Sequence, residues 1–106
     1  MGAAIVVLTT IDSKEAGERL ANALVDRKAA ACVQVIPGLT SIYRWKDNVE
    51  TSSEVLLLIK TTGEGFERVE AIIRELHTYE IPEILSLSVE NGSSDYLEWL
   101  QHSILC

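Results

Sequence analysis

Two long stretches rich in Val, Ile, Leu, Thr and Tyr, separated by the polar turn Lys46-Asp47-Asn48, constrain the fold more than any other feature. They cover residues 31–45 and 49–62, and together they predict one long β-hairpin. Pro37-Gly38 interrupts the first stretch and predicts a bulge or kink within it. At about 3.3 Å per residue, the strand from residue 33 to 45 spans roughly 43 Å.

Shorter patterns on either side of the hairpin predict two helices on the same side of a sheet. Asp12 and Glu15 resemble a capping box at the start of an amphipathic helix, and Pro82 opens a short apolar strand. The predicted elements are, in chain order, a strand over 4–10, a helix over 12–27, strands over 31–45 and 49–62, a helix over 64–77, a strand over 84–89 and a short helix over 94–100. We therefore predict a single α+β domain over residues 1–106, with the β-α-β-β-α-β order of the ferredoxin-like split βαβ fold and a short C-terminal helix.

The predicted hairpin is too long for the helices that pack on it. A helix of about 16 residues covers roughly 24 Å, so the end of the hairpin overhangs and carries Ile42, Tyr43 and Trp45. The other face of the sheet has no helix to cover it. An uncovered sheet face and a protruding apolar arm favour aggregation unless another chain covers them, so we expect a homo-oligomer.

Charge and cysteine content exclude several classes of partner. Nine Lys and Arg against sixteen Asp and Glu give a net charge of −7, which disfavours nucleic acid and anionic membrane surfaces. No apolar run approaches the roughly 20 residues of a membrane-spanning helix. The two cysteines, Cys32 and Cys106, form no Cys-x-x-Cys pair and no disulfide framework, so a reducing cytoplasm is the expected location.

The motifs of common enzymes are missing from the sequence. There is no Gly-x-Ser-x-Gly, no His-Glu-x-x-His and no EF-hand spacing, and the Gly63-Glu64-Gly65 turn lacks the lysine of a phosphate-binding loop. No pair of residues has a complete catalytic neighbourhood. We therefore expect no enzymatic activity and no obligatory cofactor.

Cys32 and His77 are the one pair of soft ligands worth weighing as the start of a site, and together they suit Cu(I), Cu(II) or Zn. The alternatives are that Cys32 is a small buried apolar residue and that His77 complements a helix C-terminus. A complete metal site needs further ligands. The candidates for these are Glu80, Glu83, His102, Cys106 or a residue of a neighbouring chain.

The segment 77–83, His-Thr-Tyr-Glu-Ile-Pro-Glu, places an imidazole, a phenol and two carboxylates around a proline-fixed turn. It is either a candidate binding loop or a helix cap followed by a solvated acidic loop. Aromatic residues elsewhere are candidates either for the core of a subunit interface or for the wall of a ligand cleft. The candidate residues of the cleft are Tyr43, Trp45, Lys60, Tyr79 and Trp99, with Lys60 and Arg44 as the bases that would pair with an anion.

Several segments together resemble the CutA divalent-cation tolerance family. They are 5–10 (IVVLTT), 30–45 (AACVQVIPGLTSIYRW), 54–62 (EVLLLIKTT), 77–84 (HTYEIPEI) and 92–100 (GSSDYLEWL). The resemblance implies a ferredoxin-like fold in a tight homotrimer, similar in architecture to PII signalling proteins. It also implies a role in tolerance of divalent metals, chiefly copper, with the family's metal-associated cysteine and histidine at Cys32 and His77. A further cysteine of some members corresponds to Thr9.

Three functional hypotheses follow. The first is a cytoplasmic trimer that responds to divalent metal ions and binds Cu(II) or another divalent cation weakly through Cys32, His77, Glu80 and Glu83. The second is a PII-like regulator that binds a small molecule in the cleft between subunits. The third is a stable scaffold that docks a protein partner which the sequence does not identify.

Overall fold

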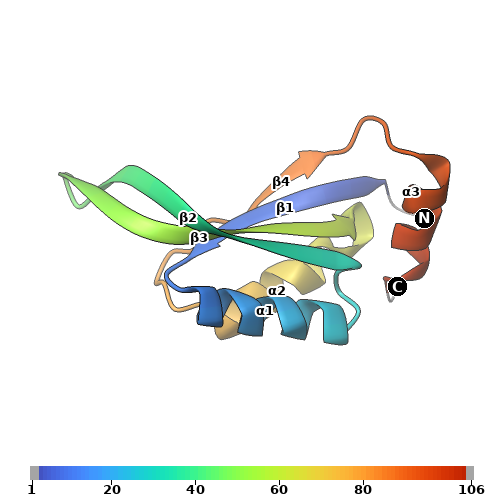
Figure 1. The fold of residues 1–106 in the computed structure, drawn as a ribbon, viewed down its shortest axis with the longest axis horizontal. Helices are drawn as coiled ribbons and strands as arrows, with labels where there is room; N and C mark the ends of the chain where they lie inside the picture. The colour runs from blue at the N-terminus through green and yellow to red at the C-terminus, as the bar shows by residue number, and fades with distance from the viewer. Residues whose placement is uncertain (1–2, 105–106) are drawn as a thin grey trace.

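The computed structural model describes residues 3–104, which form four strands and three α-helices (Figure 1). Cys106 lies outside the described residues. The elements are β1 (Ala4–Ile11), α1 (Lys14–Asp26), β2 (Cys32–Trp45), β3 (Asn48–Thr62), the 3-10 turn η1 (Gly63–Gly65), α2 (Phe66–Leu76), β4 (Leu85–Ser88) and α3 (Ser94–His102). None of the described helices is long and apolar enough to cross a membrane.

The four strands form one antiparallel sheet in the order β2-β3-β1-β4. Both α1 and α2 lie on the same face of this sheet, and α3 stands at the end opposite the hairpin tip (Figure 1). The element order, the antiparallel sheet and the one-sided helix layer confirm the predicted α+β arrangement. β4 is shorter than predicted, whereas α3 continues to His102.

The core lies between the sheet and the two long helices. Val7 of β1 and Leu57 and Ile59 of β3 are fully buried, and all three are odd-numbered positions that point to the helix layer. Leu20 and Leu24 of α1, with Val69 and Ile73 of α2, complete this layer. Close-packed burial of these side chains is the main source of stability for the sheet and helix layers.

The start of α1 differs from the sequence prediction by one residue. Ser13, not Asp12, is the N-cap, and its hydroxyl accepts a hydrogen bond of 3.1 Å from the backbone N–H of Ala16. The Asp12 carboxylate instead accepts a hydrogen bond from the hydroxyl of Thr78, at 3.2 Å. The predicted capping box of Asp12 and Glu15 is therefore wrong, because Asp12 has a partner in the loop after α2.

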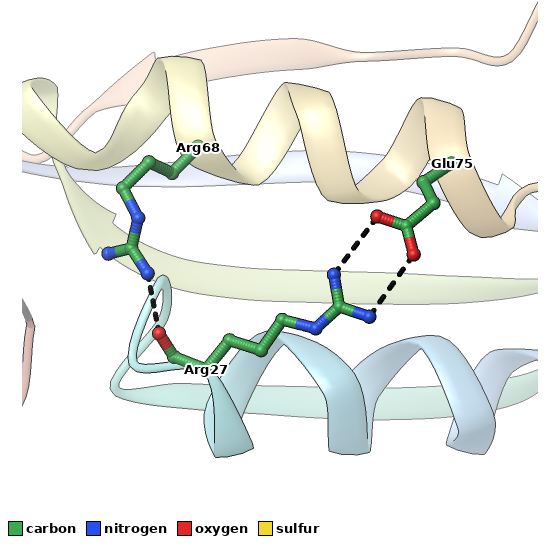
Figure 2. Close-up of polar contacts among 3 residues, drawn as sticks. All are labelled: Arg27, Arg68 and Glu75. Atoms are coloured by element: carbon green, nitrogen blue, oxygen red, sulfur yellow. Dashed lines mark hydrogen bonds and ion pairs between the residues drawn. The ribbon is translucent and has the colours of Figure 1, made fainter.

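Two arginines hold the C-terminal end of α1 against α2 (Figure 2). The Arg27 guanidinium forms a bidentate pair with the Glu75 carboxylate, at 3.0 and 3.2 Å, and lowers the pKa of that carboxyl. Arg68 donates to the backbone carbonyls of Arg27 and Lys28, where the helix leaves carbonyl groups without intrahelical partners. A cation at this end also complements the helix dipole.

The hairpin of β2 and β3 is paired from Cys32 opposite Lys60 to Trp45 opposite Asn48. A register shift between Ile36 and Leu39 confirms the predicted bulge at Pro37-Gly38, and Gly38 has a φ of 87°. The two turn residues, Lys46 and Asp47, also have positive φ, as a two-residue hairpin turn requires. Beyond the bulge, residues 39–54 protrude past the helices, and we call this part the arm (Figure 1).

The core contains one hydroxyl that we expect to destabilise it. Thr9 is fully buried in β1, and its Oγ1 has no hydrogen-bond partner among the described residues. Replacing it with the similarly shaped Val removes an unpaired polar group, so Thr9→Val should raise the free energy of unfolding by about 1–2 kcal/mol. Urea unfolding at one fixed protein concentration measures this change.

The matched control for this change is Thr61→Val, which is the same substitution at another fully buried position. The Thr61 hydroxyl donates a hydrogen bond of 2.7 Å to the carbonyl of Ala29, so its loss should lower stability by about 1–3 kcal/mol. Equal losses in both variants would show that the Thr9 hydroxyl is not a source of destabilisation.

Candidate functional site

A groove of about 870 Å³ lies between the arm, the end of β1 and the loop that joins α2 to β4. This volume lies within the roughly 300–1,000 Å³ of small-molecule sites. The lining residues are Thr10, Asp12, Ser41, Ile42, Tyr43, Trp45, Ser52, Ser53, Glu54, Thr78, Tyr79, Glu80, Ile81 and Glu83. Three segments distant in sequence therefore meet at one surface.

Hydrogen bonds from the loop hold the walls of the groove together. The Tyr79 hydroxyl donates to the Glu54 carboxylate on the arm at 2.5 Å, and Thr78 donates to Asp12 at the end of β1. His77 contacts the backbone carbonyl of Thr10 at 2.7 Å, beyond the last residue of β1 that β4 pairs with. The loop thus continues, through side chains, the edge contacts that β4 makes with β1.

Glu54 is the most deeply buried charged group of the groove, with 7% of its surface exposed. Burial, followed by the hydrogen bond to this carboxylate and its negative charge, raises the pKa of Tyr79 above its ordinary value of 10.0. The phenol therefore keeps its proton near neutral pH and remains a donor to Glu54. A buried carboxylate needs such a donor, because an unpaired buried charge is strongly destabilising.

All the charged side chains that line the groove are acidic. Its lining includes Asp12, Glu54, Glu80 and Glu83, and no Lys, Arg or His among residues 3–104 contributes to it. The prediction that Arg44 and Lys60 supply the bases of a ligand cleft therefore does not match this groove. Of the residues proposed for a ligand cleft, Tyr43, Trp45 and Tyr79 line this groove, together with the metal candidates Glu80 and Glu83.

His77 lies beside the groove with both ring nitrogens engaged. Nδ1 accepts a hydrogen bond of 3.0 Å from the backbone N–H of Tyr79, so Nε2 carries the proton and donates to the Thr10 carbonyl. The ring also packs against that of Tyr79, with centroids 4.8 Å apart. A metal ion bound at Nδ1 would have to displace the Tyr79 N–H.

Cys32 is remote from His77 within one chain. Cys32 pairs with Lys60, which pairs with Val6, whereas His77 bonds to Thr10, four residues further along β1. Four residues correspond to about 13 Å, and two strands also intervene, so one chain cannot place both side chains on one ion. Among residues 3–104, no three His, Cys, Asp or Glu side chains cluster as a metal site.

Lys60 and Trp99, the other predicted cleft residues, lie at the opposite end of the sheet. Lys60 donates to the Gln34 side chain at 2.9 Å and lines a second cavity of about 200 Å³ beneath α3. Trp99 packs against Tyr96 on α3. The sequence did not indicate that Thr10, Asp12 or Glu54 belongs to a site. The one signal for such a role is that Glu54, an acidic residue, directly precedes the apolar run 55–59.

The fold and groove define a class: a ferredoxin-like α+β domain with an overlong hairpin and a carboxylate-lined groove at its base. A family model, the CutA1 divalent ion tolerance protein, matches residues 5–103. The chain belongs to the CutA1 divalent ion tolerance family.

Named relatives and solved structures agree with this assignment. The chain is 45% identical over 98 residues to the divalent-cation tolerance protein CutA of Thermus thermophilus, covering 92% of this chain and 95% of the relative. It is 43% identical to the chloroplastic CutA of Arabidopsis thaliana, covering 93% of this chain but only 54% of that protein. The crystal structure of CutA1 from Oryza sativa superposes with a TM-score of 0.94 at 39% identity, over 98% and 96% of the two chains.

The Tyr79–Glu54 hydrogen bond yields a prediction about stability and pH. Tyr79→Phe leaves the buried Glu54 carboxylate without its donor, so the free energy of unfolding at neutral pH should fall by about 1–3 kcal/mol. The raised pKa of Tyr79 means that the unfolded chain loses the phenolic proton first. The stabilisation by Tyr79 is therefore complete below about pH 10 and decreases as the pH rises above it.

Urea unfolding of both proteins between pH 8 and 11 tests this, and the difference between them should shrink above pH 10. Tyr43→Phe is the matched control, because among the described residues its hydroxyl bonds only to Ser52 on the exposed arm, and it should change stability by less than about 0.5 kcal/mol. A stability difference that stays constant over the whole pH range would contradict the assigned bond.

Proposed function

We propose that this chain is a homotrimeric, cytoplasmic protein of divalent metal tolerance that binds divalent cations, copper among them, weakly and without enzymatic activity. The observation that carries the proposal is the groove, whose lining, within the part of the chain that the structure describes, has four carboxylates and no basic residue. Cations are attracted to such a surface, and membership of the CutA1 family supports divalent metal ions as the relevant ones.

The proposed metal ligands are Cys32, His77, Glu80 and Glu83. Glu80 and Glu83 lie exposed on the groove, next to His77 in the same loop. Since Cys32 lies on another part of the sheet, a site that includes it must take ligands from two chains. An ion bound by so few side chains of one chain is held weakly, which fits a tolerance role better than that of a permanent cofactor.

Uncovered apolar surface supports the homotrimer. On the sheet face without helices, Leu85 and Leu87 of β4 are more than half exposed. On the arm, Ile42 is 71% and Val49 65% exposed. The edges of β2 and β4 are also open to pairing, and all of these surfaces would be buried by neighbouring copies.

Light scattering tests the assembly directly. At micromolar concentration we expect a particle of about 35 kDa, three times the 11.7 kDa of one chain. Ile42→Glu places a charge on the exposed arm without touching the core, and it should shift the mass towards the monomer. A mass of one chain for the unaltered protein would contradict the trimer.

Isothermal titration with Cu²⁺ tests the metal ligands. The double variant Glu80→Gln with Glu83→Gln should lower the affinity at least about tenfold, equivalent to about 1.4 kcal/mol, because it removes two anionic ligands. His77→Ala and Cys32→Ala should each weaken binding if a site between chains uses them. Glu67→Gln, an exposed change of the same charge on α2, should leave it unaltered; unchanged affinity in every variant would refute copper binding at these residues.

A second candidate function is a PII-like regulator that binds a small molecule. The supporting observation is the size of the groove together with its aromatic wall of Tyr43, Trp45 and Tyr79. Because no base lines the groove, anionic metabolites are poor candidates for its ligand. In the proposed trimer the arm of each chain would bring the groove close to a neighbour.

A further inference from the structure

We propose that the groove is a binding site for an aliphatic amine with two or more ammonium groups. This inference rests on the second candidate function, a small-molecule site, and not on metal binding by the same protein. It assigns a ligand class from the polar groups that the groove leaves unsatisfied.

Two deeply buried polar side chains line the groove with unused hydrogen-bonding capacity. Thr10 is 8% exposed, and its hydroxyl has no hydrogen-bond partner among the described residues. Glu54 is 7% exposed, and within the same residues only its Oε2 has a partner, the Tyr79 hydroxyl. Neither Thr10 Oγ1 nor Glu54 Oε1 is a fully enclosed atom, so a donor from outside the chain can reach both oxygens from the groove.

The two groups are close enough to serve one donor. Thr10 of β1 faces Leu56 of β3, and Glu54 is two residues along β3 on the same face of the sheet. Such diagonal neighbours have Cα atoms about 7–8 Å apart, within reach of one ammonium placed between the side chains. An ammonium has three donors and no acceptor, so it can satisfy both Thr10 Oγ1 and Glu54 Oε1.

The remaining lining favours an organic cation with more than one charge. Glu80 and Glu83 are exposed at the rim, where a second ammonium can pair with them. Aromatic rings attract cations, and Lys46 of the hairpin turn already places its Nζ 5.6 Å from the ring centroid of Trp45. The volume of about 870 Å³ far exceeds that of a single ion.

The same features argue against a bare metal ion as the main occupant of the inner groove. The residues described contain no cluster of three metal-ligating side chains, and threonine hydroxyls and aromatic rings are poor ligands for copper or zinc. A flexible chain of methylene groups between ammoniums, by contrast, contacts the apolar ring faces while its charges reach separate carboxylates.

Titration calorimetry with spermidine at about 0.15 M salt tests the proposal, with the uncharged 1,4-butanediol as the ligand control. We expect saturable binding of spermidine, one per chain, and no binding of butanediol. Glu54→Gln keeps an acceptor for Tyr79 but removes the charge, and it should weaken binding at least about tenfold. Thr10→Val should weaken it about threefold, and Thr10→Ser should restore it.

Glu67→Gln controls for general charge, and circular dichroism confirms that each variant is folded. The proposal would be overturned if Glu67→Gln weakened spermidine binding as much as Glu54→Gln does. It would also be overturned if spermidine showed no saturable binding, which is the result expected when a basic side chain of a neighbouring copy fills the groove. Cu²⁺ titrated in parallel separates the two functions. Copper binding without spermidine binding overturns only this inference, and the reverse result overturns only the copper proposal.

Discussion

The structure depends on a mismatch of length between the hairpin and the helices that cover it. β2 and β3 are 14 and 15 residues long, whereas α1 and α2 have 13 and 11 residues. A strand residue advances about 3.3 Å and a helix residue about 1.5 Å, so the helices cover only the inner part of the hairpin. The arm that remains forms one wall of the groove and exposes the apolar side chains that call for a neighbour.

The loop after α2 packs against the base of the arm and forms the second wall of the groove. Without contacts to the loop, the base of the arm would be a two-stranded ribbon in water, which is marginally stable by itself. Tyr79 ties the loop to Glu54 on the arm, and Thr78 and His77 tie it to the end of β1. The hydrogen bonds that fix the arm are therefore the same ones that give the groove its buried carboxylate.

Local patterns were sufficient to predict the elements of the fold. The apolar runs of β1 and β3, the bulge at Pro37-Gly38 and the helical stripe of α2 each follow from short-range periodicity. The N-cap of α1 was misplaced by one residue because Asp12 and Ser13 are both good capping residues. The Asp12 carboxylate accepts a hydrogen bond from Thr78, which lies 66 positions away in the sequence. No local sequence pattern indicates this contact.

The candidate site was predicted only in part, because register and not composition decides which residues meet. Tyr43, Trp45 and Tyr79, which the sequence proposes for a ligand cleft, line the same groove as Glu80 and Glu83, which it proposes as metal ligands. Lys60 and Cys32 are opposite each other near the far end of the hairpin, which only the pairing of β2 with β3 reveals. Thr10 and Glu54 were missed because a single polar residue at the end of a strand is normally solvated.

Net charge and local geometry act on cations at different ranges. With −7 per chain, a trimer would carry −21, and this field would draw metal ions and organic amines alike to its surface. Such attraction is screened within about 8 Å at physiological salt, so it cannot select between cations once they arrive. Selection has to come from acceptors held in fixed directions, and in the proposed amine site these are the Thr10 hydroxyl and the second oxygen of Glu54, both on side chains that are more than nine-tenths buried. Exposed carboxylates at the rim suit transient exchange of ions, whereas the inner pair suits a donor of hydrogen bonds.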